Sequence, residues 1–241
     1  MSFTIGCDPE LVARHNGVFV QANKYFKFNS SFGTDGNSDI CEIRPGYSES
    51  PIELTAKIRS IIEYGNEKAP DLEFYAGNFV DGYPLGGHIH ISAEPTDKVI
   101  NSIDSILYSL SNCIDERDQR DKRQRTGYGK RFAFRKKDYG FEYRTPGSWL
   151  ISPSVALVTL TLAKLGVIAA VEDDIDLVEA KGSIHSNTFL KNIEAFIKTI
   201  PDDCREGLTQ LKKLLSKPID WNQNILPNWR SEEHTSELQS H

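Results

Sequence analysis

The sequence has few cysteines and arranges none of them as a metal or disulfide framework. Cys7, Cys41, Cys113 and Cys204 lie far apart and form no Cys-x-x-Cys pair. The sequence therefore signals neither a zinc knuckle nor a set of disulfide bonds. Cys7 and Cys41 each precede an acidic residue, and neighbouring side chains of a strand point to opposite faces. We expect both thiols to be buried as small apolar groups.

Long apolar runs are also missing. A helix that crosses a bilayer needs roughly 20 apolar residues, and the best candidate, residues 155–171, is interrupted by two threonines, a lysine and a glycine. The opening residues lead directly into charged sequence and do not resemble a secretory signal. We therefore expect a cytoplasmic protein with no membrane partner.

A broad excess of positive charge is absent, because 34 acidic residues outnumber 28 basic ones. Residues 117–137 are the exception, with ten basic and two acidic residues and a local charge of +8. Proteins that bind nucleic acid usually carry a broad positive surface, so we expect no nucleic-acid partner. A single basic segment is better suited to gripping a compact polyphosphate, although a solvated helix end followed by a loop would have the same composition.

The order of the patterns predicts the fold class. A chain of 241 residues can bury a substantial core, and we expect residues 1–229 to form one catalytic domain. Alternating or β-branched runs predict strands over residues 3–7, 18–20, 40–44, 72–76, 86–92, 131–135 and 140–144. Helical spacing and capping residues predict helices over residues 51–65, 153–171, 187–200 and 203–215. They also predict a helix that begins at residue 97 and runs past Ile114 into the basic segment, until Gly127 and Gly129 break it. Because strands come first and helices dominate later, we predict an α+β fold, with a largely antiparallel curved sheet and helices on one face.

The last twelve residues, 230–241, differ in character from the rest. They resemble the translation of a sequencing-adapter oligonucleotide, so we expect a non-native tail after about Trp229. For this reason His234 and His241 are given no functional role.

Four short runs place polar side chains at alternate positions. They are Asp8-Pro9-Glu10, Glu42-Ile43-Arg44, His88-Ile89-His90 and Glu142-Tyr143-Arg144. In a strand, the two polar side chains of each run point to the same face. Pro9 cannot donate a ladder hydrogen bond, which indicates a strand edge or end. We predict that the four strands lie in one sheet and direct these side chains into a common concave site.

Each run has an ordinary explanation when it is taken alone. A His-x-His strand can be a solvated face, Asp-Pro-Glu is a common turn, and Glu-x-Arg pairs can be cross-strand ion pairs. Together they are more specific. Carboxylates with an imidazole are ligands for Mg²⁺ or Mn²⁺, and arginines bind phosphate oxygens. A set that is poor in thiolates argues against structural zinc.

Three segments resemble the metal- and substrate-binding strands of the glutamine synthetase / glutamate-cysteine ligase superfamily. They are residues 6–10, 86–92 and 141–146. The sequence is most similar to the phage-type COOH-NH2 ligase (amidoligase) branch of this superfamily. Residues 35–45 resemble the acidic loop of that branch and the ligand glutamate that follows it. The resemblance implies a fold like the glutamine synthetase catalytic domain. It also implies a ligase that uses ATP and Mg²⁺ (or Mn²⁺) to join a carboxylate to an amine.

The resemblance further implies individual roles. The implied ligands of two or three divalent ions are Asp8, Glu10, Glu42, His88 and Glu142. The residues implied near the ATP phosphates are His90, Arg125, Lys130, Arg131 and Arg135. The implied substrate-binding residues are Asp35, Arg44 and Arg144, and the implied catalytic residues are Glu142, Arg144 and Arg135. The larger enzymes generally carry glutamate where this chain has Asp8, so a bridging water is an alternative to direct ligation there.

The chemistry of the residues is compatible with this activity. A carboxylate is a poor electrophile, and its phosphorylation by ATP gives an acyl phosphate that an amine can attack. Phosphoryl transfer requires positioning and charge neutralisation, which metals and arginines supply. The substrates would be small-molecule or peptide carboxylates and amines, and a homo-oligomer is compatible with this function. Two alternatives are a metal-dependent hydrolase or oxygenase built on the His-x-His strand and an inactive ligand-binding relative.

Overall fold

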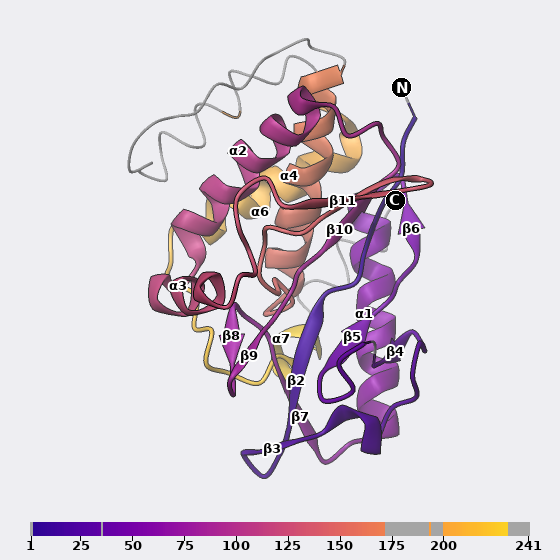
Figure 1. Cartoon of the computed structure of the whole chain (residues 1–241), viewed down its shortest axis with the longest axis vertical. Coiled ribbons are helices and arrows are strands. Elements are labelled where there is room, and N and C mark those ends of the chain that lie inside the picture. Colours follow the sequence, from indigo (N-terminus) through magenta and orange to yellow (C-terminus); the bar gives the residue numbers. More distant parts are fainter. Residues whose placement is uncertain (1, 35, 172–192, 194–199, 231–241) are drawn as a thin grey trace.

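The computed structural model describes residues 2–34, 36–171, 193 and 200–230 (Figure 1). Asp35, most of the helix expected over residues 187–200 and the tail from residue 231 lie outside these residues. Predictions about those parts of the chain therefore stay predictions.

Short antiparallel strands form two main sheets. The first sheet contains, in spatial order, β11 (Phe134–Lys137), β12 (Gly140–Tyr143), β10 (Ile89–Ile91), β1 (Ile5–Cys7) and β6 (Tyr47–Ser48). The second contains β3 (Val18–Val20), β2 (Glu10–His15), β5 (Cys41–Ile43) and β4 (Phe32–Gly33), with β7 (Leu72–Tyr75) also paired to β2. A separate hairpin consists of β8 (Phe79–Val80) and β9 (Tyr83–Pro84).

The strands predicted to share one sheet therefore belong to two, which meet at Asp8 and Pro9. On one side of this joint the Asp8 amide donates to the His88 carbonyl over 3.3 Å. On the other side the Pro9 carbonyl accepts from the Ile43 amide over 3.0 Å. Pro9 has no N–H to donate, but the Glu10 amide beyond it donates to the Gly86 carbonyl over 2.9 Å. Strand β1 ends at Cys7, next to the predicted strand end, and backbone hydrogen bonds connect one sheet to the next.

The helices begin where the sequence supplies caps. In α1 (Pro51–Lys68) the Ser50 hydroxyl accepts from the Glu53 amide, and proline occupies the first helical position. In α2 (Asp97–Ile114) Thr96 caps the Val99 amide in the same way. Within the described residues the other helices are η1 (Ala22–Lys24), α3 (Arg117–Arg125), α4 (Pro153–Val171), α6 (Asp202–Leu214) and α7 (Leu226–Arg230).

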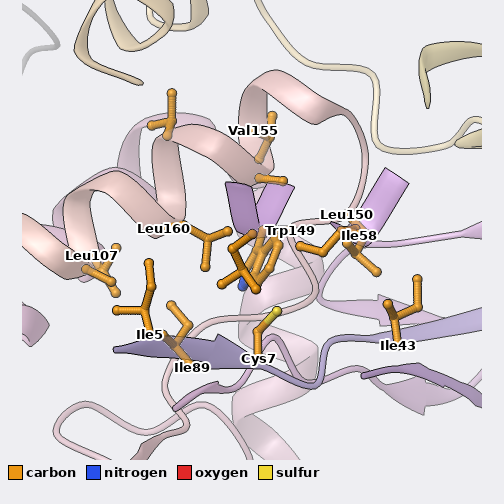
Figure 2. Packing of buried hydrophobic residues seen from close by; sticks show 14 of the residues in the cluster. Ile5, Cys7, Ile43, Ile58, Ile89, Leu107, Trp149, Leu150, Val155 and Leu160 are labelled. Atoms are coloured by element: carbon orange, nitrogen blue, oxygen red, sulfur yellow. The ribbon is translucent and has the colours of Figure 1, made fainter. Parts of the chain in front are cut away.

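Helix α4 is the centre of the hydrophobic core. It contacts α1, α2 and α6, and Figure 2 shows its Val155 and Leu160 above Ile5 and Cys7 of β1. By length and composition α4 could cross a membrane, but 83% of its most apolar window is buried inside the protein. It is packed as a core helix. The predicted α+β class, with antiparallel strands and helices covering one sheet face, is confirmed.

Two boundaries in the basic segment differ from the prediction. Helix α2 ends at Ile114, where Asp115 adopts an extended backbone, so α3 is a separate helix. Strand β11 begins at Phe134 instead of Arg131, because Phe132 has a positive φ of 59° that no regular strand accommodates. The expected burial of Cys7 and Cys41 is confirmed, and desolvation raises the pKa of both thiols.

Candidate functional site

The strand register gathers the polar side chains on the face of the first sheet that is opposite to the core. One row of register partners crosses the sheet as Gly6, His90, Glu142 and Arg135. Because side chains alternate along a strand, residues two positions further on share this face. Those residues are Asp8, His88 and Arg144.

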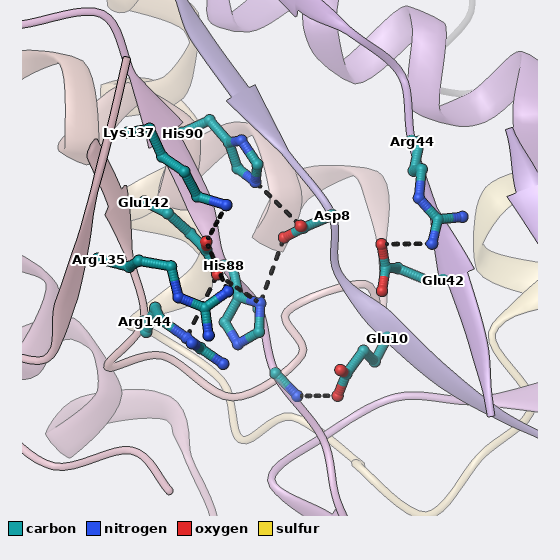
Figure 3. A network of polar contacts seen from close by, with 12 residues as sticks. Asp8, Glu10, Glu42, Arg44, His88, His90, Arg135, Lys137, Glu142 and Arg144 are labelled. Carbon is teal, nitrogen blue, oxygen red and sulfur yellow. Dashed lines mark hydrogen bonds and ion pairs between the residues drawn. The ribbon is translucent and has the colours of Figure 1, made fainter. Parts of the chain in front are cut away.

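Three of the five predicted metal ligands converge at the centre of this face (Figure 3). The Nδ1 atom of His88 lies 3.3 Å from Asp8 Oδ1 and 3.5 Å from Glu142 Oε1. One ligand atom from each residue lies within 4.8 Å of the other two. His88 and Glu142 are only 7% and 3% exposed. The predicted convergence of these strands is therefore present, although they come from distant parts of the sequence.

The buried atoms of this cluster fit a cation. Asp8 Oδ1 is buried, and its neighbour in the cluster is His88 Nδ1, the ring atom that also faces Glu142. Buried polar atoms usually have a partner from the protein, from water or from an ion. Two carboxylates and an imidazole are a donor set that Mg²⁺ or Mn²⁺ accepts, so the residues present fit a divalent cation.

The electrostatic setting keeps the Asp8 carboxyl ionised. Burial by itself would raise its pKa, but hydrogen bonds and positive charge from His88 and His90 outweigh burial. The pKa of Asp8 consequently lies well below its usual value. His90 contributes through its Nε2 atom, 3.0 Å from Asp8 Oδ2. An ionised carboxylate is the form that a cation binds.

Glu142 is surrounded by basic side chains as well as by His88. Its Oε2 atom lies 2.9 Å from Lys137 Nζ and 3.8 Å from Arg135 Nη1, and its Oε1 atom lies 3.3 Å from Arg144 Nε. Arg135 and Arg144 were predicted for the site and Lys137 was not. These cations lie where a phosphate group bound next to the carboxylates would be neutralised.

Two glycines let the strand carrying His88 approach its surroundings. A Cβ atom on Gly86 would lie 2.4 Å from His88 Nε2, and a Cβ atom on Gly87 would lie 2.0 Å from the Gly147 carbonyl oxygen. Both distances are far below normal contact. The glycines of the Gly-Gly-His-Ile-His motif are therefore required by the position of the imidazole and of the neighbouring backbone.

Glu10 and Glu42 lie at the border of the cluster, in the second sheet. They are register partners on β2 and β5, so two carboxylates face each other across the strands. Glu42 pairs with Arg44 over 2.8 Å, and Glu10 accepts a hydrogen bond from the Gly86 amide over 2.6 Å. Burial raises the pKa of Glu10, although the positive charges of His88 and Arg123 oppose that rise.

Arg44, predicted to bind substrate, also holds the preceding loop. Its guanidinium donates to the Ser30 carbonyl over 3.0 Å and to the Thr34 carbonyl over 3.2 Å. Together with the Glu42 ion pair, these contacts tie β5 to the segment before it.

The predicted phosphate-binding residues of the basic segment are dispersed. Arg125, Lys130 and Arg135 are exposed. Arg131 instead pairs with Asp104 over 2.8 Å and lies over the rings of Tyr108 and Phe132. The structure thus places only Arg135 of this group next to Glu142.

Sequence reasoning missed three polar residues around the site, Arg123, Lys137 and Tyr139. It also missed Asp104, which is buried on the core side of the first sheet, where it accepts from the Tyr143 hydroxyl. Arg123 is 1% exposed, and it donates to the Thr145 carbonyl over 2.7 Å, which fixes the backbone after Arg144. Burial lowers its pKa to about 10. The Tyr139 hydroxyl lies 2.5 Å from Nδ1 of His90, and burial raises the pKa of Tyr139 to about 12. For Asp104 the sequence did offer a signal, because it is a charged residue inside the apolar stripe of α2.

Comparison with known proteins places the chain in a family. No curated protein matches it. A solved structure described as a "novel glutamine synthase homolog" is similar over 89% of this chain, with 13% sequence identity and a TM-score of 0.49. The chain spans 66% of the length of that structure. The model of one protein family, "Phage phiEco32-like COOH.NH2 ligase-type 2", matches residues 5–231. The chain therefore belongs to the phage phiEco32-like COOH-NH2 ligases of type 2.

Proposed function

We propose that this protein is an ATP-dependent ligase that forms an amide bond between a carboxylate and an amine through an acyl phosphate. The observation that carries the proposal is the cluster of Asp8, His88 and Glu142 beside basic side chains, in a chain that belongs to a COOH-NH2 ligase family. Acidic ligands for a cation and positive groups for phosphate lie side by side, as phosphoryl transfer requires.

The proposed reaction has two steps. A carboxylate oxygen of the first substrate attacks the γ-phosphorus of ATP, and ADP leaves with the electron pair of the broken P–O bond. The neutral amine of the second substrate then attacks the carbonyl carbon. Inorganic phosphate leaves, and the nitrogen gives up a proton. No protein nucleophile is needed in either step.

A bound Mg²⁺ or Mn²⁺ would neutralise the phosphate oxygens, and Asp8, His88 and Glu142 are the residues that would hold it. Glu10 and Glu42 add carboxylates at the border for a further ion. Arg135 Nη1 lies 3.8 Å from Glu142 Oε2, and most of the Arg135 side chain is exposed. Its guanidinium can therefore turn toward the transferred phosphoryl group.

Arg144 is the better candidate for the carboxylate substrate. Its Nε atom lies 3.3 Å from Glu142 at the centre of the cluster, whereas the guanidinium of Arg44 holds two loop carbonyls as well as Glu42. The substrates are a small-molecule or peptide carboxylate and an amine. A cytoplasmic location would supply both of these and ATP.

The test is a screen for ADP release with Mg²⁺ or Mn²⁺ across amino acids and short peptides. We expect ADP release to require a carboxylate and an amine together. In Glu142→Gln and His88→Ala, the rate should fall by about 100-fold or more, which corresponds to about 2.7 kcal/mol of lost transition-state stabilisation. Glu94→Gln is the matched control, because Glu94 is exposed and pairs only at the surface with Lys136. Unchanged turnover in both site variants would contradict the assignment.

A further inference from the structure

Lys137 makes the shortest ion pair to the buried carboxylate of the cluster. It is the last residue of β11, next to the turn that leads into β12, and its Nζ atom lies 2.9 Å from Glu142 Oε2. The two partners differ in exposure, because the side chain of Lys137 is 31% exposed and that of Glu142 is 4% exposed. An accessible ammonium group therefore covers an inaccessible carboxylate.

This ammonium and a divalent cation would compete for the same carboxylate. Glu142 is one of the three residues whose ligand atoms converge. Mg²⁺ binds carboxylate oxygens at about 2.1 Å, so a cation on Glu142 would lie within a few ångströms of the lysine charge. Like charges at that separation repel each other strongly in a partly buried site. Lysine can move away easily, because its charge sits at the end of a flexible four-carbon stem.

We propose that Lys137 is a displaceable counter-ion of Glu142, which occupies the carboxylate in the cation-free protein and leaves it when a divalent cation binds. The inference rests on the proposed function, since it requires a cation at this cluster. Lys137 adds the shortest of the ion pairs that offset the burial of this carboxylate, beside those from Arg135 and Arg144. It also gives Lys137 a role in setting the affinity for the cation.

The neighbouring lysine is a matched control. Lys136 lies on the opposite face of the same strand and pairs with Glu94 over 3.3 Å, and both of these side chains are largely exposed. Removing the Lys136 charge changes the net charge of the hairpin by the same amount without touching Glu142.

The first experiment measures Mn²⁺ binding without nucleotide, by the electron paramagnetic resonance signal of free Mn²⁺. We expect Lys137→Met to bind Mn²⁺ about five- to tenfold more tightly than the wild type, because the competing charge is gone. Lys136→Met should stay within about twofold, since exposed pairs contribute little. An affinity of Lys137→Met equal to or weaker than that of the wild type would overturn the inference.

The second experiment uses the unmodified protein, so it does not depend on how a variant folds. Lysines are acetylated briefly with and without saturating Mn²⁺, and the extent of modification is read by mass spectrometry. Labelling of Lys137 should rise several-fold with Mn²⁺, while that of Lys136 stays constant. Constant labelling of Lys137 in protein that binds Mn²⁺ would overturn this inference alone. Failure of the wild type to bind Mn²⁺ would overturn it together with the proposed metal site.

Discussion

The buried carboxylate of Asp104 on α2 should be a major determinant of stability. Asp104 is fully buried, and its two oxygens accept from donors in the loop before β11 and in β12. Oδ2 accepts from Arg131 Nε over 2.8 Å. Oδ1 accepts from the Phe132 amide over 2.7 Å and from the Tyr143 hydroxyl over 2.9 Å. One side chain thus joins α2 to the loop before β11 and to β12.

The variant that tests this network is Asp104→Asn, which keeps the shape and removes the charge. If the amide oxygen takes the place of Oδ1, its NH₂ group must face the Arg131 guanidinium, donor against donor. One charge-assisted hydrogen bond is lost, and the two others become weaker neutral bonds. Since hydrogen bonds to charged groups contribute about 1.5–3 kcal/mol each and breaking a buried pair costs about 3–5 kcal/mol, we expect a loss of about 3 kcal/mol of unfolding free energy.

The assay is urea unfolding followed by tryptophan fluorescence. Asp97→Asn is the control, because Asp97 is an exposed residue in the first turn of the same helix and its interaction with the helix dipole contributes only about 0.3–1 kcal/mol. Tyr143→Phe, which removes a single donor, should cost about 1 kcal/mol. If Asp104→Asn costs less than Tyr143→Phe, the carboxylate does not organise these segments and the reasoning is refuted.

Two further predictions concern the strand with the Gly-Gly-His motif and the cysteines. Gly86→Ala should weaken Mn²⁺ binding by at least about tenfold, because its Cβ atom would lie 2.4 Å from His88 Nε2. The control is Gly36→Ala, whose Cβ atom would have no atom within 4 Å and which should leave Mn²⁺ binding unchanged. Equal Mn²⁺ affinities of the two variants in isothermal titration would contradict this prediction. In native protein a thiol reagent should modify at most Cys113, since Cys7, Cys41 and Cys204 are buried and burial raises the pKa of Cys204 to about 12. Rapid reaction of two or more thiols before unfolding would show that the core opens.

Features that depend on adjacent residues could be predicted from the sequence. The alternation of His88 and His90 with isoleucines fixes which side chains share a strand face, and Ser50 followed by Pro51 marks a helix start. These are local rules, and the structure follows them. The face of the first sheet that carries Glu142 could be deduced in the same way.

Features that depend on contacts between distant segments could not be predicted. The ion pair of Lys137 with Glu142 requires the exact length of the turn between β11 and β12. The pairing of Asp104 with Arg131 joins residues 27 positions apart, and the family resemblance that implied a phosphate role for Arg131 gave no sign of it. Likewise Arg123 looked like one more solvated basic residue, yet it is buried under the backbone that follows Arg144.

The joint between the two sheets brings the Asp8 carboxylate close to two histidines. The Asp8 amide donates to the His88 carbonyl and the Glu10 amide to the Gly86 carbonyl, which keeps the two backbones close on both sides of Pro9. At this short distance the Asp8 carboxylate already lies 3.3 Å from His88 Nδ1 and 3.0 Å from His90 Nε2. A glutamate would have to fold its extra methylene into a largely buried space between the two imidazoles. The close approach of the two backbones therefore places the short Asp8 side chain beside both imidazoles, and we expect it to reach a bound cation without a bridging water.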